Sequence, residues 1–310
     1  MREMVASNDI VAIPQRHWGR KVAGVFVAAA ALWVVSLFVF TPNINWETVW
    51  EYLTFRTIIA GIGVTIVLTV ISMIGGAIFG VIAALMRLSQ STVLRTVSWV
   101  YLWVFRGTPF LVQIIFWYNL ALFLPRIGWG TFSVSTNVVM TSFVAASIAL
   151  TLNSGAIMAE IIRGGILSVD AGQSEAATAL GMSRLNTMFK VVLPQAFRVI
   201  VPATGNHLIG MLKETSLVSV IAAQELLTQT QIIYGRNYQV IELLIVASFW
   251  YLVMTSICTF LQQRLEARLA LSVSGRGDPK DRRGKRRRPA VDLEAPLTDI
   301  VSPQPRNEEK

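Results

Sequence analysis

The sequence predicts an all-α integral membrane protein with about six spans. Of its 310 residues, 54% are hydrophobic and only 15% are charged, which is too little charge to cover the surface of a soluble protein. Apolar runs recur along the chain, and each reaches roughly the 20 helical residues that cross a hydrocarbon core. These runs leave little room for a separate soluble domain.

The six apolar runs cover residues 22–40, 57–86, 97–124, 138–159, 191–212 and 240–261. The first run follows Arg20 and Lys21, as the apolar region of a signal peptide would. However, it is longer than such a region, and no small-residue cleavage site follows it. We therefore interpret it as a retained transmembrane helix.

The second run would extend about 45 Å at 1.5 Å per residue, so it exceeds the hydrocarbon thickness and predicts a tilt or a kink. Gly75, Gly76 and Gly80 provide a place for the bend. Gly76 and Gly80 also form a pair of small residues that lets another helix approach closely. That helix can belong to the same chain or to a second subunit, and the sequence leaves both alternatives open.

The distribution of Lys and Arg predicts that both termini are cytoplasmic. Short loops on the side of the termini hold five basic residues, whereas the opposite loops hold four. Residues 1–21 are then a cytoplasmic N-terminal tail. The segment 272–310 is polar, carries a dense basic run and supplies much of the net charge of +9, so we expect a disordered cytoplasmic tail. Such a tail favours contact with anionic membrane lipid over nucleic acid.

The loop between the fourth and fifth runs has helical character. Asp170 and Ser174 are available as N-caps of a first helix, and Gly181 stands where a left-handed C-cap would end it. Ser183 can cap a second helix that runs to Leu193, before Pro194 resets the backbone for the next span. The pattern predicts a helix–turn–helix element at the inner membrane face, with Ala176, Ala177 and Leu180 on one side of the first helix. A further apolar stretch, 215–223, is too short to cross and predicts a re-entrant or surface helix on the outer side.

The spacing in this loop resembles the EAA loop of ABC importer permeases. It comprises Glu175-Ala176-Ala177, three residues, Gly181, nine residues, Val191, one residue and Leu193-Pro194. From about Thr57 to Arg268 the chain resembles more narrowly the polar amino acid permeases of the histidine, glutamate, glutamine, arginine and opine group. The motifs that carry this resemblance are Phe105-Arg106-Gly107-Thr108-Pro109, Asn153-Ser154-Gly155-Ala156, Ala159-Glu160-Ile161-Ile162-Arg163-Gly164-Gly165, Gly172-Gln173-Ser174-Glu175, Leu193-Pro194-Gln195-Ala196 and Lys213-Glu214-Thr215-Ser216-Leu217. Two positions depart from the family pattern, because Val191 replaces the usual isoleucine and Ile157 stands where an aromatic residue is common.

The resemblance implies a five-helix ABC importer permease core over 57–268, to which run 22–40 adds one N-terminal transmembrane helix. It implies binding-protein-dependent import of polar amino acids, or a similar small solute, across the bacterial inner membrane. The implied partners are ABC ATPase subunits, a second permease copy or paralogue, and a periplasmic or secreted solute-binding protein. The loop 160–194 would couple to the ATPase, through Glu175, Ala176, Ala177, Leu180, Gly181, Leu193 and Pro194.

Five polar residues are candidates for the translocation path or its gate: Arg106, Asn153, Glu160, Arg163 and Lys213. Glu160 and Arg163 are three apart on one helix, so a plain surface pair is the simpler interpretation and a gating role the alternative. Arg106 can lie near the solute path or hold the subunit pair together, or it can extend to the headgroups. Lys213 is by default an outer anchor beside Glu214.

No nucleotide-binding, metal-binding or catalytic motif is found. Gly-x-x-x-x-Gly-Lys-Ser/Thr, His-Glu-x-x-His and Gly-x-Ser-x-Gly are absent, so we expect no enzyme activity, no metal and no cofactor in this chain, with ATP used by the partner. The alternative function is an ion-coupled secondary amino acid carrier, for which Glu242 and His207 are the only weak coupling candidates. That alternative leaves the EAA loop unexplained, and no internal repeat supports it. A third class, an intramembrane enzyme, has no visible catalytic constellation.

Overall fold

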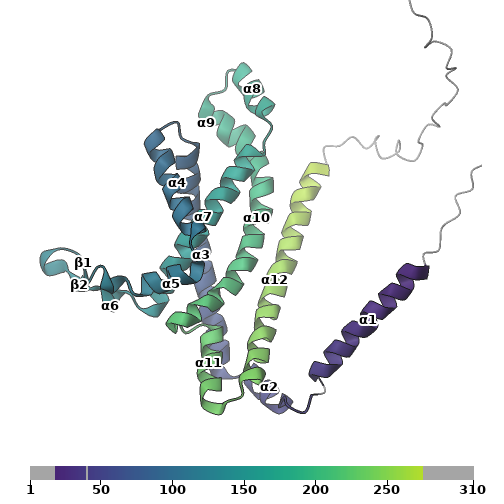
Figure 1. Ribbon diagram of the computed structural model, residues 1–310. Helices are drawn as coiled ribbons and strands as arrows, with labels where there is room; N and C mark the ends of the chain where they lie inside the picture. The colour runs from purple at the N-terminus through teal and green to yellow at the C-terminus, as the bar shows by residue number, and fades with distance from the viewer. Residues whose placement is uncertain (1–17, 40, 275–310) are drawn as a thin grey trace, which may run out of the picture. The chain divides into compact units, whose positions relative to one another are not determined.

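The computed structural model describes residues 18–39 and 41–274, and this part of the chain is almost entirely helical (Figure 1). The α-helices are α1 (Trp18–Val39), α2 (Trp46–Leu53), α3 (Arg56–Leu88), α4 (Thr92–Gly107), α5 (Phe110–Tyr118), α6 (Thr136–Val139), α7 (Ser142–Leu167), α8 (Ala171–Ala179), α9 (Arg184–Thr187), α10 (Leu193–Glu214), α11 (Leu226–Asn237) and α12 (Val240–Ser274). The shorter elements are the 3₁₀ turns η1 (Leu120–Leu122), η2 (Gly130–Phe132) and η4 (Thr215–Ile221), the π turn η3 (Met188–Val192), and the antiparallel pair β1 (Arg126–Ile127) and β2 (Val134–Ser135).

Three helices in the described part are long and apolar enough to cross a membrane: α3, α7 and residues 240–268 of α12. The pair α4 and α5 makes a fourth if the two helices form one broken span. The apolar stretch within α1, Val22–Val34, is shorter than these three helices. The predicted membrane character and all-helical class are confirmed, but the predicted count of six spans is not. The predicted tails cover 1–21 and 272–310, and their residues 1–17 and 275–310 lie outside the described residues. Residues 18–21 belong to α1, and residues 272–274 belong to α12.

The predicted run 97–124 is not one continuous helix, because the chain breaks at Thr108 and Pro109. Helix α4 ends at Gly107, and α5 begins at Phe110 with Pro109 as its N-cap residue. Proline has no backbone N–H to donate, and it disfavours helical dihedrals in the residue before it, so a straight helix cannot pass through this point. Arg106 therefore lies in the last turn of α4.

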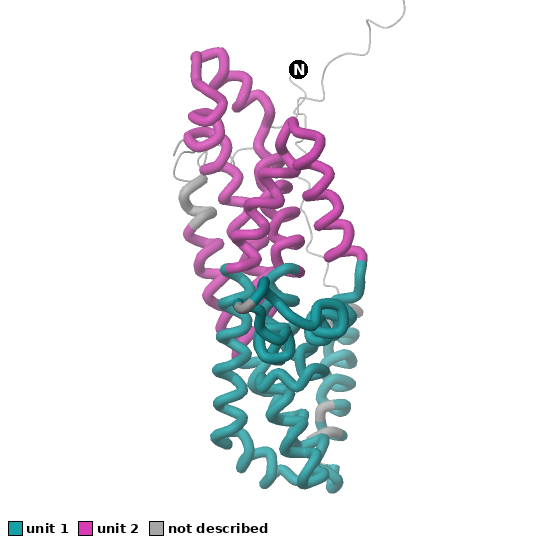
Figure 2. The backbone as a smooth tube through the Cα atoms, turned by 90° about the vertical axis from the view of Figure 1, so that its left-hand side faces the viewer, with its two compact units in different colours: residues 1–74, 108–152, 212–253 teal, residues 75–107, 153–211, 254–310 magenta. Residues whose placement is uncertain are grey.

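The structure divides into two compact units (Figure 2). Unit 1 comprises residues 1–74, 108–152 and 212–253, and unit 2 comprises 75–107, 153–211 and 254–310. In unit 2, Ala83, Leu102 and Ala159 form a small core beside Tyr101, and Ser98 Oγ donates a hydrogen bond to the Ala83 carbonyl at 2.8 Å. Small residues dominate this core, which allows the helix backbones to approach closely.

Gly76 and Gly80 are the clearest case of such an approach. A Cβ added to Gly76 would lie 2.3 Å from Ser154 Oγ, and one added to Gly80 would lie 2.5 Å from Met158 Cβ. Both glycines are on α3 and both neighbours are on α7 within unit 2. The sequence left open whether the approaching helix belongs to the same chain or to a second subunit. In this structure it is α7 of the same chain.

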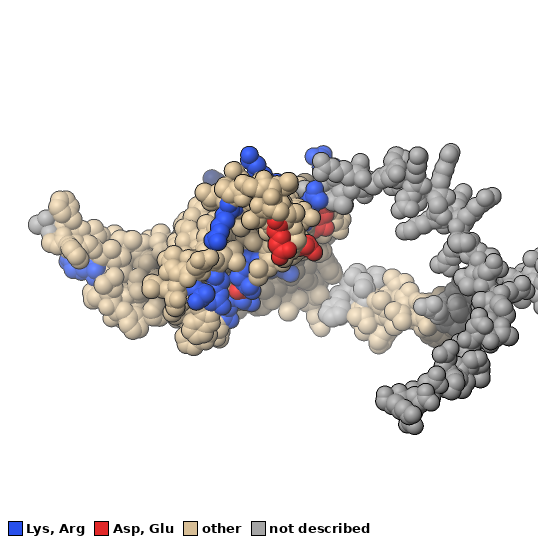
Figure 3. Space-filling view, turned by 90° about the horizontal axis from the view of Figure 1, so that it is seen from above, with Lys and Arg blue, Asp and Glu red and all other residues tan. Residues whose placement is uncertain are grey.

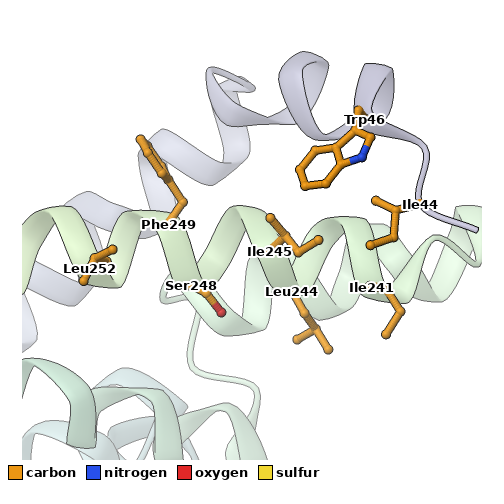
Figure 4. Close-up of a pocket in the computed structure, with 8 residues that line it drawn as sticks. All are labelled: Ile44, Trp46, Ile241, Leu244, Ile245, Ser248, Phe249 and Leu252. Atoms are coloured by element: carbon orange, nitrogen blue, oxygen red, sulfur yellow. The ribbon is translucent and has the colours of Figure 1, made fainter. Parts of the chain in front are cut away.

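In unit 1, α2 is attached to α12 at both ends. The Asn45 backbone N–H donates to Glu242 Oε1 at 3.0 Å, and Trp250 Nε1 donates to the Leu53 carbonyl at 2.9 Å. Beside these contacts lies an apolar groove of about 480 Å³, lined by Ile44, Trp46, Ile241, Leu244, Ile245, Ser248, Phe249 and Leu252 (Figure 4). Glu242, which a secondary carrier would need for ion coupling, accepts a structural hydrogen bond here.

Candidate functional site

Helix α8 has the two caps that its sequence predicts. Asp170 Oδ1 accepts a hydrogen bond from the Gly172 N–H at 2.7 Å at the N-terminus. At the C-terminus, Gly181 has a φ of +77°, in the left-handed region that favours glycine. The Met182 N–H donates to the Ala177 carbonyl at 3.1 Å and the Gly181 N–H donates to the Thr178 carbonyl at 2.9 Å, which together form a Schellman motif.

The second helix also begins as predicted but ends differently. Ser183 Oγ accepts from the Asn186 N–H at 3.4 Å and caps α9. The chain then widens into the π turn η3, where the Leu193 N–H donates to the Met188 carbonyl, and continues directly into α10. The expectation that Pro194 resets the backbone is therefore wrong. Pro194 lies in the first turn of α10, directly after the π turn.

The residues of this helix–turn–helix element differ in exposure. Glu175, Ala176, Gly181 and Leu180 are exposed, and Leu180 is 83% exposed despite its large apolar side chain. Ala177, which the sequence places on the same side of the helix as Ala176 and Leu180, is only 4% exposed. Helix α8 packs on α9 and on η3. Figure 3 looks onto the end of unit 2 that carries α8, where Lys and Arg side chains gather with a smaller group of acidic ones.

A cluster of charged side chains forms between α4 and α7 in unit 2. Glu160 Oε1 lies 3.6 Å from Arg106 Nη1, and Glu160 Oε2 lies 3.2 Å from Arg163 Nη2. The side chain of Glu160 is 29% exposed, against 53% for Arg106 and 33% for Arg163. Asn153 Nδ2 donates to the Phe105 carbonyl at 3.3 Å, one residue before Arg106. One carboxylate thus lies between two guanidinium groups at the end of α4.

This cluster borders a cavity of about 440 Å³, lined by Arg87, Trp99, Leu102, Trp103, Arg106, Gly107 and Glu160. The structure therefore brings together four of the five residues predicted for the path or gate: Arg106, Asn153, Glu160 and Arg163. The fifth, Lys213, belongs to unit 1 and is exposed. Sequence reasoning missed that Arg106 joins the Glu160–Arg163 pair, because a contact between residues 54 positions apart leaves no local pattern.

Three further observations limit what the described residues can do. His207 Nε2 and Ser154 Oγ are hydrogen-bonded at 2.9 Å, so this weak candidate for ion coupling has a side-chain partner within unit 2. No group of three or more His, Cys, Asp or Glu side chains suited to a metal ion occurs among the residues that the structure describes. The stretch 215–223 contains the predicted short helix as η4, but four of its residues, Thr215, Val218, Ile221 and Ala223, are buried.

Comparison with known proteins gives a consistent result. Residues 76–271 match the model of a family described as the binding-protein-dependent transport system inner membrane component. The arginine transport system permease protein ArgU of Corynebacterium glutamicum is 43% identical over 262 residues, which is 84% of this chain and 83% of that protein. The glutamine transport system permease protein GlnP of Escherichia coli is 34% identical over 227 residues, which is 73% of this chain and 98% of that protein.

Solved structures agree with these relatives. A crystal structure of an amino acid ABC transporter with histidines superposes with a TM-score of 0.65 at 36% identity, covering 73% of this chain and 99% of its own. The MetNI methionine ABC transporter in an inward-facing conformation superposes with a TM-score of 0.56 at 21% identity, covering 69% of this chain and 96% of its own, and this likeness concerns the fold alone.

Proposed function

Because this chain belongs to the family of binding-protein-dependent transport system inner membrane components, we propose that it moves polar amino acids inward as one of two permease chains bound to two ATPase subunits. It is a multi-pass inner-membrane protein and the permease subunit of an amino-acid ABC transporter, as its relatives are. ATPase and solute-binding protein partners follow from the family. The pairing with a second copy or a paralogue, and the cytoplasmic position of both termini, are part of the proposal.

The observation that carries the coupling role is the capped helix–turn–helix element with exposed Leu180 at its tip. A large apolar side chain exposed on an element with fixed caps suits docking to another protein, because burial of that side chain would favour association. The element holds Glu175, Ala176 and Gly181 at the surface beside Leu180. Ala177, Leu193 and Pro194 support its shape, since Ala177 is buried and Pro194 lies in the first turn of α10.

The solute class is supported by the relatives, which are named for arginine, cystine and glutamine transport. The test is co-purification of this chain with its ATPase and its solute-binding protein, followed by a binding assay of the latter with a panel of amino acids. A polar amino acid bound in preference to sugars and peptides is the expected result. A partner protein that selects another solute class would remove the amino acid assignment.

ATP chemistry belongs to the partner in this proposal. No phosphate-binding loop is present in the sequence, so the purified chain alone is expected neither to bind nor to hydrolyse ATP. Nucleotide binding by equilibrium titration and phosphate release both measure this. Turnover by the isolated chain, at a rate that survives removal of every contaminating ATPase, would contradict the proposed division of labour.

Glu160 is the residue of the charged cluster whose replacement is most informative. Glu160→Gln leaves Arg106 and Arg163 without the shared carboxylate, so we expect uptake to fall while the protein accumulates normally in the membrane. Stability should change little, because partly exposed ion pairs contribute only about 0–1 kcal/mol. Glu266→Gln is the control, since Glu266 accepts from Gln262 on its own helix. Equal uptake by wild type and both variants would leave the cluster with a surface role only.

A further inference from the structure

Unit 1 contains a fully buried carboxylate outside the charged cluster. Glu225 is 0% exposed and precedes α11 as its N-cap residue. Its Oε1 accepts from the Thr228 N–H at 2.7 Å and from Thr228 Oγ1 at 3.0 Å. Its Oε2 accepts from the Leu227 N–H at 2.9 Å and from the Tyr251 hydroxyl at 2.7 Å. Each oxygen thus receives two hydrogen bonds, which is the pattern of an ionised carboxylate.

The hydrogen bonds of Glu225 connect several elements of the chain. Tyr251 comes from α12, and its hydroxyl also interacts with the side chains of Thr65 on α3 and Thr215 on η4. The Leu226 N–H donates to Thr65 Oγ1 at 3.2 Å. We call Thr65, Thr215, Glu225, Thr228 and Tyr251 the Glu225 clamp. Of these, Thr65 and Thr215 are 0% exposed and Thr228 is 3% exposed, so the clamp is an interior polar network.

Helix capping alone does not explain this arrangement. A short side chain such as Ser or Asp satisfies the first N–H groups of a helix. The longer Glu side chain does so and also reaches a helix that begins beyond the end of α11. A buried carboxylate is costly unless donors compensate it, and a network with every member satisfied holds its parts in one geometry.

The segment held by the clamp has little stability of its own. Residues of η4 form a 3₁₀ helix, whose hydrogen-bond geometry is poorer than that of an α-helix, and Ala222 at its end has a left-handed φ of 53°. Two members of the clamp flank η4. Thr215 is its first residue, and Glu225 follows its last residue, Ile221, as the N-cap residue of α11. The motif Lys213-Glu214-Thr215-Ser216-Leu217 overlaps η4, which begins at Thr215.

We propose that Glu225 is a positioning residue for solute translocation, which together with Tyr251 locks residues 213–228 against α3 and α12. This inference rests on the proposed function, because it concerns the geometry of a permease motif. Without the Glu225 clamp, residues 213–228 would populate other conformations. A smaller fraction of the permease would then hold this segment in the conformation that supports transport.

Two variants and a control test the clamp. Glu225→Gln places an amide NH₂ where one oxygen receives two donors, so it disrupts one pair of hydrogen bonds. Tyr251→Phe is milder, because it removes the donor on α12 and leaves the cap of α11 intact. Glu242→Gln is the matched control, since Glu242 is also buried in unit 1, at 7% exposure, but contacts Asn45 and not the clamp.

The measurements use the reconstituted complex of permease, ATPase and solute-binding protein. Hydrogen exchange of residues 213–228 is expected to quicken in both clamp variants and to stay unchanged in Glu242→Gln. The maximal uptake rate should fall about tenfold in Tyr251→Phe, as for loss of one hydrogen bond to a charged group, with an unchanged KM for the loaded binding protein. The double variant should resemble Glu225→Gln alone, because both changes act through one contact.

Each contrary result has a distinct meaning. Faster hydrogen exchange of residues 213–228 with normal uptake in Tyr251→Phe would show that Glu225 serves only as the N-cap of α11. That result would overturn the proposal. Unchanged exchange in both clamp variants would show that the clamp does not hold the segment, and would overturn it as well. A wild-type complex without ATP-driven uptake would instead refute the proposed function, and the translocation role would fall with it.

Discussion

Gly181→Val is expected to abolish most solute uptake while the protein still accumulates in the membrane. Gly181 has a φ of +77°, and left-handed dihedrals cost about 1–2 kcal/mol for an ordinary residue and more for a β-branched one. The Schellman motif that ends α8 would open, and the orientation of exposed Leu180 would change. Because the change lies outside the predicted spans, membrane insertion should not be affected.

The matched control for this prediction is Gly181→Asn. Asparagine tolerates the left-handed region, so this variant should keep the turn and most of the uptake. The measurement is uptake at equal membrane levels, together with retention of the ATPase during purification. Gly181→Val complexes that keep the ATPase and transport normally would show that the turn between α8 and α9 is not the coupling element.

Gly76→Val should have the second large effect, and here the protein itself should be lost. Its Cβ would lie 2.3 Å from Ser154 Oγ, closer than non-bonded atoms approach. Ser154 cannot easily retreat, because it is 0% exposed and hydrogen-bonded to His207 at 2.9 Å. Overpacking of this kind costs about 1–3 kcal/mol or more. We therefore expect a strong decrease in the amount of folded permease extracted from the membrane.

Gly63→Val is the control on the same helix, since a Cβ at Gly63 meets no atom within 4 Å. It should accumulate like wild type. Both variants replace glycine by valine on α3, so they change helix propensity alike and differ only in the atoms that the new side chain meets. A difference between the size-exclusion profiles of the two extracted proteins therefore reports the packing at Gly76. Equal recovery of both variants would mean that α3 and α7 do not approach as closely as described.

The features that the sequence predicts correctly are those fixed by local chemistry. Asp170, Gly181 and Ser183 have their predicted capping roles, because a cap depends on residues within one or two turns. Hydropathy also indicates the membrane class and most helices. It does not locate the break at Pro109, where the apolar run 97–124 predicts a continuous helix but α4 ends at Gly107 and α5 begins at Phe110.

The features that the sequence does not predict depend on packing between distant segments. Arg106 meets Glu160, and Tyr251 meets Glu225, only because separate helices lie side by side in the fold. The burial of Ala177, on a helix that packs on η3, is likewise not readable from a local pattern. No periodicity or short motif contains that information in a single sequence.

ATP-driven uptake by the reconstituted complex distinguishes an ABC importer permease from a secondary carrier. The permease, its ATPase and its solute-binding protein are placed in vesicles without any ion gradient, and accumulation of a labelled polar amino acid is followed on addition of ATP. We expect accumulation that requires ATP, the ATPase and the binding protein together. Uptake by the permease alone, driven by an imposed proton or sodium gradient and indifferent to ATP, would contradict it and favour a secondary carrier.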